Sequence, residues 1–259
     1  MEITVIIPYY NSSEFIEKTL DSVKLQTYLP KEVIIVDDFS SDIHNLNFIL
    51  NNKNNYPFEL VIIKHNNNRG AAAARNSGIK VSKCDYIAFL DADDCWVNSK
   101  LNKQVQLIGD FDLLFCSYSE TKDLISYKKK HSVLNNVNYL HILKKNLSPV
   151  TLLVKKSSII MFDERFRRCD DFKMTIEALA EGRKIGFIDI DVAYGFKRAI
   201  GGGGLTGSLT KMSISFLKAC LILIYERPIL IFRIIPFVIF ELIKFPIRCL
   251  KVYTIKLKK

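Results

Sequence analysis

Three carboxylates within four residues, Asp91, Asp93 and Asp94, are the strongest chemical signal in the sequence. They follow an aromatic and β-branched run at 86–90, which predicts a buried strand ending in an acidic turn. Alternate strand side chains share a face, so Asp91 and Asp93 are expected together at the carboxyl edge of a sheet, where open α/β folds place ligands. Mg²⁺ and Mn²⁺ take such oxygen ligands along with substrate phosphates. The alternative is an acidic loop that caps a helix starting near Asn98.

Arginines flank the start of an alanine-rich segment that predicts a helix packed closely on the sheet. Gly70 permits a tight entry turn, and Arg69 and Arg75 accompany the first turns of the helix. A helix N-terminus with nearby arginines favours phosphate binding. The alternative is a pair of solvated arginines.

Asp170 and Asp171 open another predicted helix, which runs through Ala180 and stops at Gly182. Adjacent carboxylates at a helix start can simply complement the helix dipole. They can also hold a general base at the mouth of a cleft. Asp171 is the better candidate for that base if Asp170 is turned toward the helix cap.

Apolar runs alternate with segments of helical length along most of the chain, which predicts βαβ units and a parallel sheet. Right-handed crossovers would then bring the polar ends of the first strands to one edge of that sheet. The segment from about 120 to 145 is rich in Lys and Asn, and is predicted to be a mostly helical connection. The expected strands cover 3–8, 33–36, 60–64, 86–90, 111–118, 150–155 and 185–190.

Composition sets the broad class of the protein. A chain of 259 residues, 49% of them hydrophobic, is long enough for one large α/β domain or two small ones. Its six cysteines form no C-x-x-C pair, which favours reduced, buried thiols in a cytosolic protein. We expect no export signal, because the sequence begins directly with an apolar strand.

The net charge of +10 is concentrated at the C-terminal end. Residues 211–259, which we call the tail, hold ten Lys and Arg against two Glu and therefore carry +8 of it. The tail is also strongly apolar, but charged residues and prolines interrupt every run of about 20 residues, the length a membrane-spanning helix needs. This pattern favours helices that lie on the cytoplasmic face of an anionic membrane through residues 213–259. A bent re-entrant hairpin is the alternative, and no nucleic-acid partner is expected.

A glycine-rich stretch at 201–208 precedes the tail, with Lys197 and Arg198 just before it. A loop of this composition is expected to be mobile. It is interpreted either as a lid that closes over a phosphate-bearing ligand, or as a linker to the tail.

The chain resembles the family 2 glycosyltransferases, which are inverting nucleotide-sugar enzymes with the GT-A fold, in five short motifs and in their order. The resemblance covers about residues 2 to 200. It rests on Val5-Ile-Ile-Pro8-Tyr-Tyr10-Asn11, Ile35-Val36-Asp37-Asp38-Phe-Ser40-Ser-Asp42, Asn68-Arg-Gly70 with Ala74-Arg75-Asn76, Phe89-Leu-Asp91-Ala-Asp93-Asp94, and Asp170-Asp171. The domain it implies is residues 1–210, with a nucleotide-binding half at about 1–118 and an acceptor half at about 119–210, followed by a membrane-associating tail.

The resemblance also implies roles for individual residues. Asp171 would be the catalytic base, Asp93 would ligate a Mg²⁺ or Mn²⁺ ion that bridges the donor diphosphate, and Asp91 would lie beside the ribose and the metal. Asp38 would accept a hydrogen bond from the nucleotide base. The nucleotide-sugar site would comprise Pro8, Tyr10, Asn11, Asp38, Arg69, Arg75, Asp91, Ala92, Lys197 and Arg198.

The implied activity is transfer of a sugar from a nucleotide-sugar to a hydroxyl of a saccharide on a polyprenyl diphosphate. The family resemblance favours a UDP-sugar as the donor. Surface polysaccharide assembly, such as that of O-antigen, is the implied process, on the inner face of the cell membrane. Two departures affect this inference. The usual Glu-Asp pair is Asp170-Asp171 here, and an arginine-histidine pattern is reduced to Lys197-Arg198, which leaves open which cation faces the leaving group.

Three other functions compete with this interpretation. A nucleotidyltransferase would usually have a Gly-rich loop where this chain has Pro8-Tyr-Tyr-Asn11. A phosphatase of the haloacid dehalogenase type would place its D-x-D turn after the first strand. A catalytically inactive, membrane-docked partner of another transferase would not need Asp91, Asp93 and Asp171.

Overall fold

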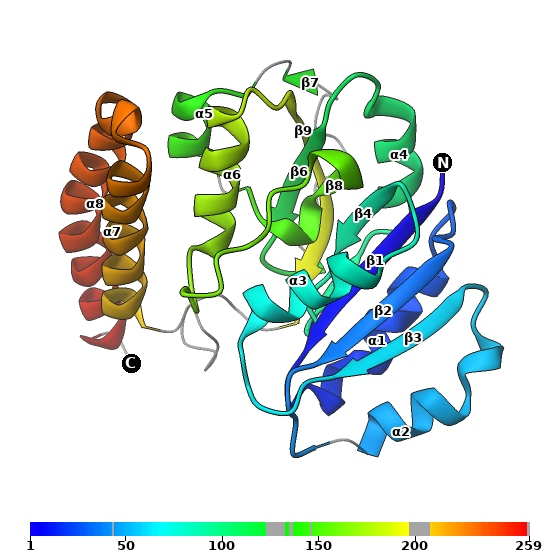
Figure 1. Cartoon of the computed structure of the whole chain (residues 1–259). Coiled ribbons are helices and arrows are strands. Elements are labelled where there is room, and N and C mark those ends of the chain that lie inside the picture. The colour runs from blue at the N-terminus through cyan, green and yellow to red at the C-terminus, as the bar shows by residue number, and fades with distance from the viewer. Residues whose placement is uncertain (43, 123–132, 135–136, 146, 197–207, 258–259) are drawn as a thin grey trace.

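The computed structural model describes residues 1–257 apart from 43, 123–132, 135–136, 146 and 197–207. Lys197, Arg198 and nearly all of the glycine-rich stretch therefore lie outside the described residues. A mixed sheet forms the centre of the molecule, and helices flank it (Figure 1). The strand order is β3-β2-β1-β4-β8-β6-β9-β5, with β7 paired to β9.

The N-terminal half has the parallel arrangement that the sequence predicted. Its strands are β1 (Ile3–Tyr9), β2 (Glu32–Asp37), β3 (Glu59–Lys64) and β4 (Tyr86–Phe89). Its helices are α1 (Ser13–Lys24), α2 (His44–Asn51) and α3 (Ala71–Val81). Val5 of β1 lies opposite Val33 of β2 and Ala88 of β4, all in parallel pairing. The carboxyl ends of these strands therefore meet at one edge of the sheet.

The second half of the sheet is mixed in direction. Here β8 (Leu153–Lys155) runs antiparallel to both β4 and β6 (Leu113–Ser119), and β9 (Ile185–Gly195) runs parallel to β6. Two short strands that the sequence analysis did not predict, β5 (Asp94–Trp96) and β7 (Val133–Leu134), pair antiparallel with β9. The helices are α4 (Lys100–Leu107), α5 (Tyr139–Lys144) and α6 (Asp170–Ala180), and short 3-10 helices cover Lys53–Asn55, Pro149–Thr151 and Lys156–Ser158.

Small residues bring α3 against the sheet. Ala72, Ala73 and Ala74 are buried, and a Cβ atom at Gly78 would lie only 2.5 Å from a side-chain carbon of Ile6 on β1. This close approach has a functional consequence, because it carries Arg75 into the interior of the protein rather than to the solvent.

The tail forms two long helices, α7 (Leu209–Glu226) and α8 (Ile231–Leu257), joined by a 3-10 turn at Pro228–Leu230. They stand side by side at one end of the molecule, and α5 and α6 separate them from the sheet (Figure 1). Their inner faces share an apolar core with α6, to which Ile176, Cys220, Leu223, Ile234 and Phe237 contribute. Within the part of the chain that the structure describes, neither helix is long and apolar enough to cross a membrane.

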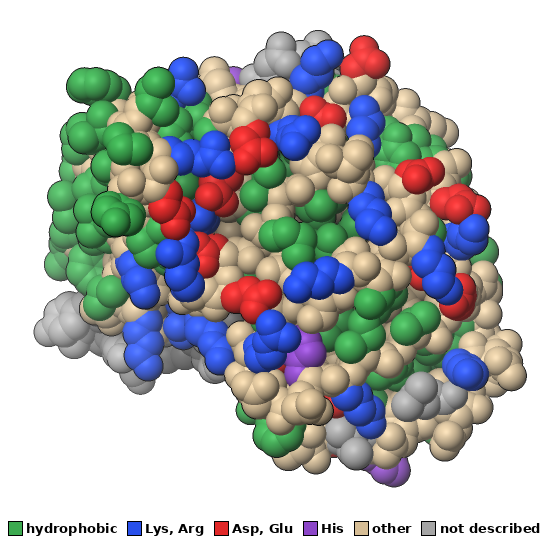
Figure 2. Space-filling view, in the orientation of Figure 1, with side chains coloured by type: hydrophobic (Ala, Val, Ile, Leu, Met, Phe, Trp, Pro, Cys, Tyr) green, Lys and Arg blue, Asp and Glu red, His purple; other side chains and the backbone are tan. Residues whose placement is uncertain are grey.

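The outer side of the tail exposes many large apolar side chains. Tyr225 and Ile229 are each 86% exposed, and Phe232 is 83% exposed. Figure 2 shows apolar side chains gathered over the end of the molecule where α7 and α8 lie. We call this set the apolar surface of the tail: Ile214, Leu221, Tyr225, Ile229, Ile231, Phe232, Ile235, Ile239, Phe240, Leu242, Ile243, Ile247 and Leu250.

Candidate active site

Side chains from several loops organise the carboxyl edge of the parallel strands. Asn11, which has a positive φ of 46°, follows β1 and accepts hydrogen bonds through Oδ1 from the backbone N–H groups of Ser41 at 3.0 Å and Asp42 at 3.2 Å. The backbone N–H of Asn11 donates in return to Oγ of Ser40 at 3.0 Å. These contacts fix the loop after β1 to the loop after β2.

Asp38 fixes the loop that leads into α3. Its buried carboxylate accepts hydrogen bonds from the backbone N–H groups of Arg69 at 2.8 Å and Gly70 at 2.6 Å. Nδ1 of His65 lies 2.8 Å from the same carboxylate, and Nε2 of His65 lies 2.9 Å from Oγ of Ser77. Contact of Asp38 with a nucleotide base stays a prediction. The visible role of its carboxylate is to hold the turn before Arg75.

Arg75 connects two parts of the predicted site. Its side chain, only 7% exposed, donates to Oδ1 of Asp91 at 2.8 Å and to Oδ2 of Asp170 at 3.0 Å. The Cζ atom of its guanidinium also lies over the ring of Phe162, 5.3 Å from the ring centroid, as a cation–π contact. Burial acts to lower the pKa of Arg75, but the carboxylates of Asp91 and Asp170 outweigh it and raise that pKa, so the residue stays cationic. The structure therefore brings together Asp91 and Asp170, which are far apart in sequence.

The three carboxylates after β4 have different environments. Asp91 is partly open, with a side chain 35% exposed, and Asp93 is half-buried. Asp94 is buried and accepts a hydrogen bond from the hydroxyl of Tyr118 at 2.7 Å. Burial, and next the charge of Asp91, raise the pKa of Asp94 well above its usual range. Asp94 is therefore a structural carboxyl group, and Asp91 and Asp93 remain the candidate metal ligands.

The pair Asp91 and Asp93 fits a hard divalent cation whose other ligands come from a diphosphate and water, because such ions often use only one or two protein carboxylates. Within the described residues, no group of three or more His, Cys, Asp or Glu side chains is arranged to hold a metal by itself. A metal at this edge would thus depend on the substrate for the rest of its coordination.

Asp170 and Asp171 begin α6, as predicted, directly after Cys169 in a left-handed conformation with φ of 62°. Asp170 turns toward Arg75, while Asp171 lines a cavity of about 370 Å³ between α5, α6, α7 and α8. We call this space the helix cavity. Burial, and next the charge of Asp170, raise the pKa of Asp171 to about 6. A carboxyl group with this pKa, in a cavity and beside the Arg75 pair, has the properties of a general base.

The remaining described residues of the predicted nucleotide-sugar site differ in their exposure. Tyr10 is 51% exposed, Pro8 is partly buried, and Arg69 pairs with Glu164 at 2.7 Å. Ala92 is buried, and its backbone carbonyl accepts a hydrogen bond from Oγ1 of Thr19 at 3.0 Å. Contact of these residues with a nucleotide-sugar stays a prediction.

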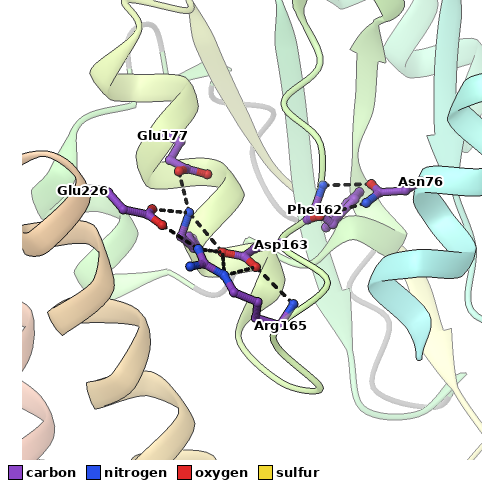
Figure 3. Close-up of polar contacts among 7 residues, drawn as sticks. Asn76, Phe162, Asp163, Arg165, Glu177 and Glu226 are labelled. Atoms are coloured by element: carbon purple, nitrogen blue, oxygen red, sulfur yellow. Dashed lines mark hydrogen bonds and ion pairs between the residues drawn. The ribbon is translucent and has the colours of Figure 1, made fainter. Parts of the chain in front are cut away.

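A buried lysine links α6 to the tail, and sequence reasoning did not identify it. Nζ of Lys173 lies 2.6 Å from Glu177, 3.0 Å from Glu226 of α7 and 3.3 Å from Asp163. Figure 3 shows these three carboxylates converging, with Arg165 joining Asp163 to Glu226. The same view shows Asn76 of α3 holding the backbone of Phe162 by two hydrogen bonds, of 2.8 and 2.9 Å. The segment before α6 is therefore fixed on both sides.

Comparison with known proteins matches residues 4–166 to the model of the family described as glycosyl transferase family 2. The chain is 31% identical over 204 residues to the amylovoran biosynthesis glycosyltransferase AmsB of Erwinia amylovora, a match covering 73% of this chain and 66% of AmsB. It is 32% identical over 190 residues to WfaP of Escherichia coli, covering 70% of this chain and 72% of WfaP. WfaP is named a UDP-Glc:α-D-GlcNAc-diphosphoundecaprenol β-1,3-glucosyltransferase. The match with AmsB thus spans just under two thirds of that relative's length.

Solved structures confirm the predicted GT-A fold. The chain superposes on S. aureus TarS in complex with UDP-GlcNAc with a TM-score of 0.69 at 24% identity, over 86% of this chain and 67% of that one. It also superposes on the mannosyltransferase PcManGT of Pyrobaculum calidifontis, in complex with GDP-Man and Mn²⁺, with a TM-score of 0.65 at 18% identity, over 86% of this chain and 64% of that one.

Proposed function

The chain belongs to glycosyl transferase family 2, and on that basis we propose that it is a metal-dependent, inverting glycosyltransferase of surface polysaccharide assembly. It moves a sugar from a UDP-sugar to a hydroxyl of a saccharide carried on a polyprenyl diphosphate. The observation that carries this proposal is the buried Arg75 bridge, which joins Asp91 at the sheet edge to Asp170, the neighbour of Asp171. The bridge thereby fixes the carboxylate proposed to lie beside the nucleotide-sugar, Asp91, relative to the proposed base, Asp171.

On the donor side, Asp91 and Asp93 would hold Mg²⁺ or Mn²⁺ together with the donor diphosphate. When bound, that ion neutralises the charge that grows on the leaving nucleoside diphosphate. The residues of this chain orient the ligands, because Arg75 fixes one oxygen of Asp91 and the α3 packing fixes Arg75.

On the acceptor side, Asp171 acts as the base. A carboxyl group with a pKa of about 6 is largely ionised at neutral pH, and takes a hydroxyl proton more readily than an ordinary aspartate. The hydroxyl oxygen then attacks the anomeric carbon as the bond to the diphosphate breaks. One base and no covalent nucleophile lead to a single displacement with inversion, so an α-linked donor gives a β-glycoside.

The properties of the tail support the proposal that the acceptor is held at a membrane surface. Its exposed apolar side chains and its charge of +8 suit a helix pair lying in the cytoplasmic face of an anionic membrane. We therefore place the protein peripherally on the inner face of the cell membrane. The names of AmsB and WfaP refer to polysaccharide synthesis and to a diphosphoundecaprenol acceptor, which fits this location.

The decisive experiment measures donor binding by calorimetry, and sugar transfer, across a panel of nucleotide-sugars with Mn²⁺ or with a chelator. Asp93→Ala is expected to lose metal-dependent donor binding, whereas Asp171→Asn keeps donor binding and loses transfer. Asp110→Asn, which removes an exposed carboxylate elsewhere, serves as the matched control. A wild-type protein that binds no member of the panel, or an α-linked product from an α-linked donor, would contradict the proposal.

A further inference from the structure

The helix cavity is built jointly by the tail and by α5, α6 and the residues beside them, and not by the sheet. It lies between α5, α6, α7 and α8, and its volume of about 370 Å³ is in the range of ordinary small-ligand sites. The lining residues are Ile142, Leu143, Lys144, Lys145, Leu147, Cys169, Asp171, Phe172, Thr175, Met212, Phe216, Phe237, Phe240, Glu241, Lys244 and Arg248. This lining combines an aromatic floor, a set of cations and the predicted base.

Aromatic rings from three helices form the floor. The ring centroid of Phe172 on α6 lies 4.5 Å from that of Phe216 on α7 and 5.3 Å from that of Phe237 on α8. Phe240, one turn further along α8, also lines the cavity and is itself 39% exposed, as part of the apolar surface of the tail. The cavity is therefore continuous with the surface proposed to contact the membrane.

Four cations line the same cavity against two carboxylates. Lys144 and Lys244 are exposed at its rim. Glu241 and Ser213 orient Arg248 through its Nη2 atom, while its Nε atom is buried without a hydrogen-bond partner among the described residues. Lys145 also contacts Asp189, at 3.4 Å, a carboxylate that does not line the cavity. Lys144 and Lys244, together with the unused buried Nε donor of Arg248, suit a multiply charged anion such as a diphosphate.

Asp171 relates this cavity to the reaction. It lies in the wall beside Phe172, and its neighbour Asp170 contacts Arg75 at 3.0 Å, which in turn contacts Asp91. A molecule in the helix cavity thus has the predicted base on one side and the apolar surface of the tail on the other.

We propose that the helix cavity binds the diphosphate and the first prenyl units of the lipid-linked acceptor, so that α7 and α8 form part of the active site. The cations hold the diphosphate, the aromatic floor holds the start of the chain, and the rest of the chain leaves over Phe240 into the membrane. This inference rests on the proposed function. A free phosphate compound would make no use of the aromatic floor, which is why we commit to a lipid diphosphate.

The test uses the whole protein and a water-soluble probe, N-acetylglucosamine joined through diphosphate to a farnesyl chain. Its binding is measured by calorimetry beside the same sugar diphosphate ending in a methyl group, and beside inorganic diphosphate. The farnesyl probe is expected to bind at least about tenfold more tightly than the methyl probe, since several buried methylene groups separate them. Lys244→Ala should weaken both probes about tenfold, which corresponds to loss of a charge-assisted hydrogen bond.

Lys211→Ala provides the matched control, because it removes an exposed lysine of α7 that does not line the cavity. Phe240→Ala should reduce only the preference for the farnesyl probe. Equal binding of the farnesyl probe and inorganic diphosphate would indicate a free phosphate ligand and overturn the inference, as would identical affinities for Lys244→Ala and Lys211→Ala. If the wild type binds the farnesyl probe as expected but transfers no sugar from any donor, the cavity assignment stands and the proposed function fails.

Discussion

The carboxyl edge of the parallel strands and the tail are organised in opposite ways. At the edge, charged groups are buried with specific partners, as in the hydrogen bonds of Asp38 to two backbone N–H groups and of Arg75 to two carboxylates. In the tail, large apolar groups such as Phe232 and Ile229 face solvent. Burying charged groups has a desolvation cost, so the groups at the edge require partners in fixed geometry. The exposed apolar groups of the tail require another surface that covers them.

Helix α6 belongs to both regions. Its first residue, Asp170, contacts Arg75, while Lys173, one turn later, contacts Glu226 of α7. Asp171 lies between these two contacts. We therefore expect the position of Asp171 to depend both on the contact of α6 with Arg75 and on its contact with the tail.

The largest expected effect comes from removing the base itself. Asp171→Asn should lower the rate of transfer by about 10²- to 10⁴-fold, the usual contribution of a positioned general base. Donor binding should persist, because the Arg75 pair is untouched. Steady-state kinetics with saturating donor would measure the loss. A variant that retained wild-type turnover would remove Asp171 from the mechanism.

Breaking the Arg75 bridge should have the largest effect on stability. Arg75→Met leaves Asp91 and Asp170 without their shared cation, and breaking a buried ion pair in this way costs about 3–5 kcal/mol. Chemical denaturation would measure the change in the free energy of unfolding. Lys80→Met on the exposed face of the same helix is the control, with an expected change within about 0.5 kcal/mol. Equal stability of both variants would show that the bridge is dispensable.

The pH dependence of transfer should report the environment of Asp171. Because its pKa is raised to about 6, turnover should fall about tenfold per pH unit below that value as the base becomes protonated. Stability should show the opposite trend: a carboxyl group with a raised pKa in the folded state stabilises that state as the pH falls from about 6 to about 4. The difference in unfolding free energy between wild type and Asp171→Asn isolates this contribution. A difference that does not change across the window would contradict the assignment.

The sequence was informative where physical patterns are local. Strand and helix alternation predicted the parallel half and its polar edge, and Asp170-Asp171 was correctly expected at the start of α6. The same reasoning missed β5 and β7, because strands of three and two residues carry no measurable periodicity. It placed Arg75 near a phosphate but did not identify its bridge, since its partners lie 16 and 95 residues away in the chain.

The tail shows the same limit from another direction. Its composition predicted helices with an apolar surface, and two helices are present. Because apolar residues occur on most sides of α7 and α8, composition did not reveal which of them pack on α6. Nor did it reveal that Phe237 and Arg248 would share a cavity with Asp171. The contact of His65 with Asp38 likewise has no signal in the sequence spacing of the two residues.

A smaller effect is expected from the surface of the tail. Phe232→Ser removes a side chain that is 83% exposed, so the free energy of unfolding in solution should change by less than about 0.5 kcal/mol. Binding to anionic vesicles should weaken by about tenfold or more, because a buried aromatic side chain contributes about 1.5–3 kcal/mol. Vesicle sedimentation would measure it. Substitution is preferable to deleting the tail, since deletion would also remove Glu226 from Lys173.

The smallest effect should come from loosening the contact between the two regions. Glu226→Gln weakens one of three carboxylate contacts to Lys173 and one contact to Arg165, which should cost about 1 kcal/mol because the other partners remain. Glu59→Gln, which removes the exposed partner of Lys83 at the start of β3, away from α6 and the tail, is the matched control. If α7 helps to position Asp171, Glu226→Gln should also reduce turnover a few-fold at unchanged donor affinity, and Glu59→Gln should not. Equal turnover in the two variants would mean that the contact of α6 with Arg75 sets the position of the base without the tail.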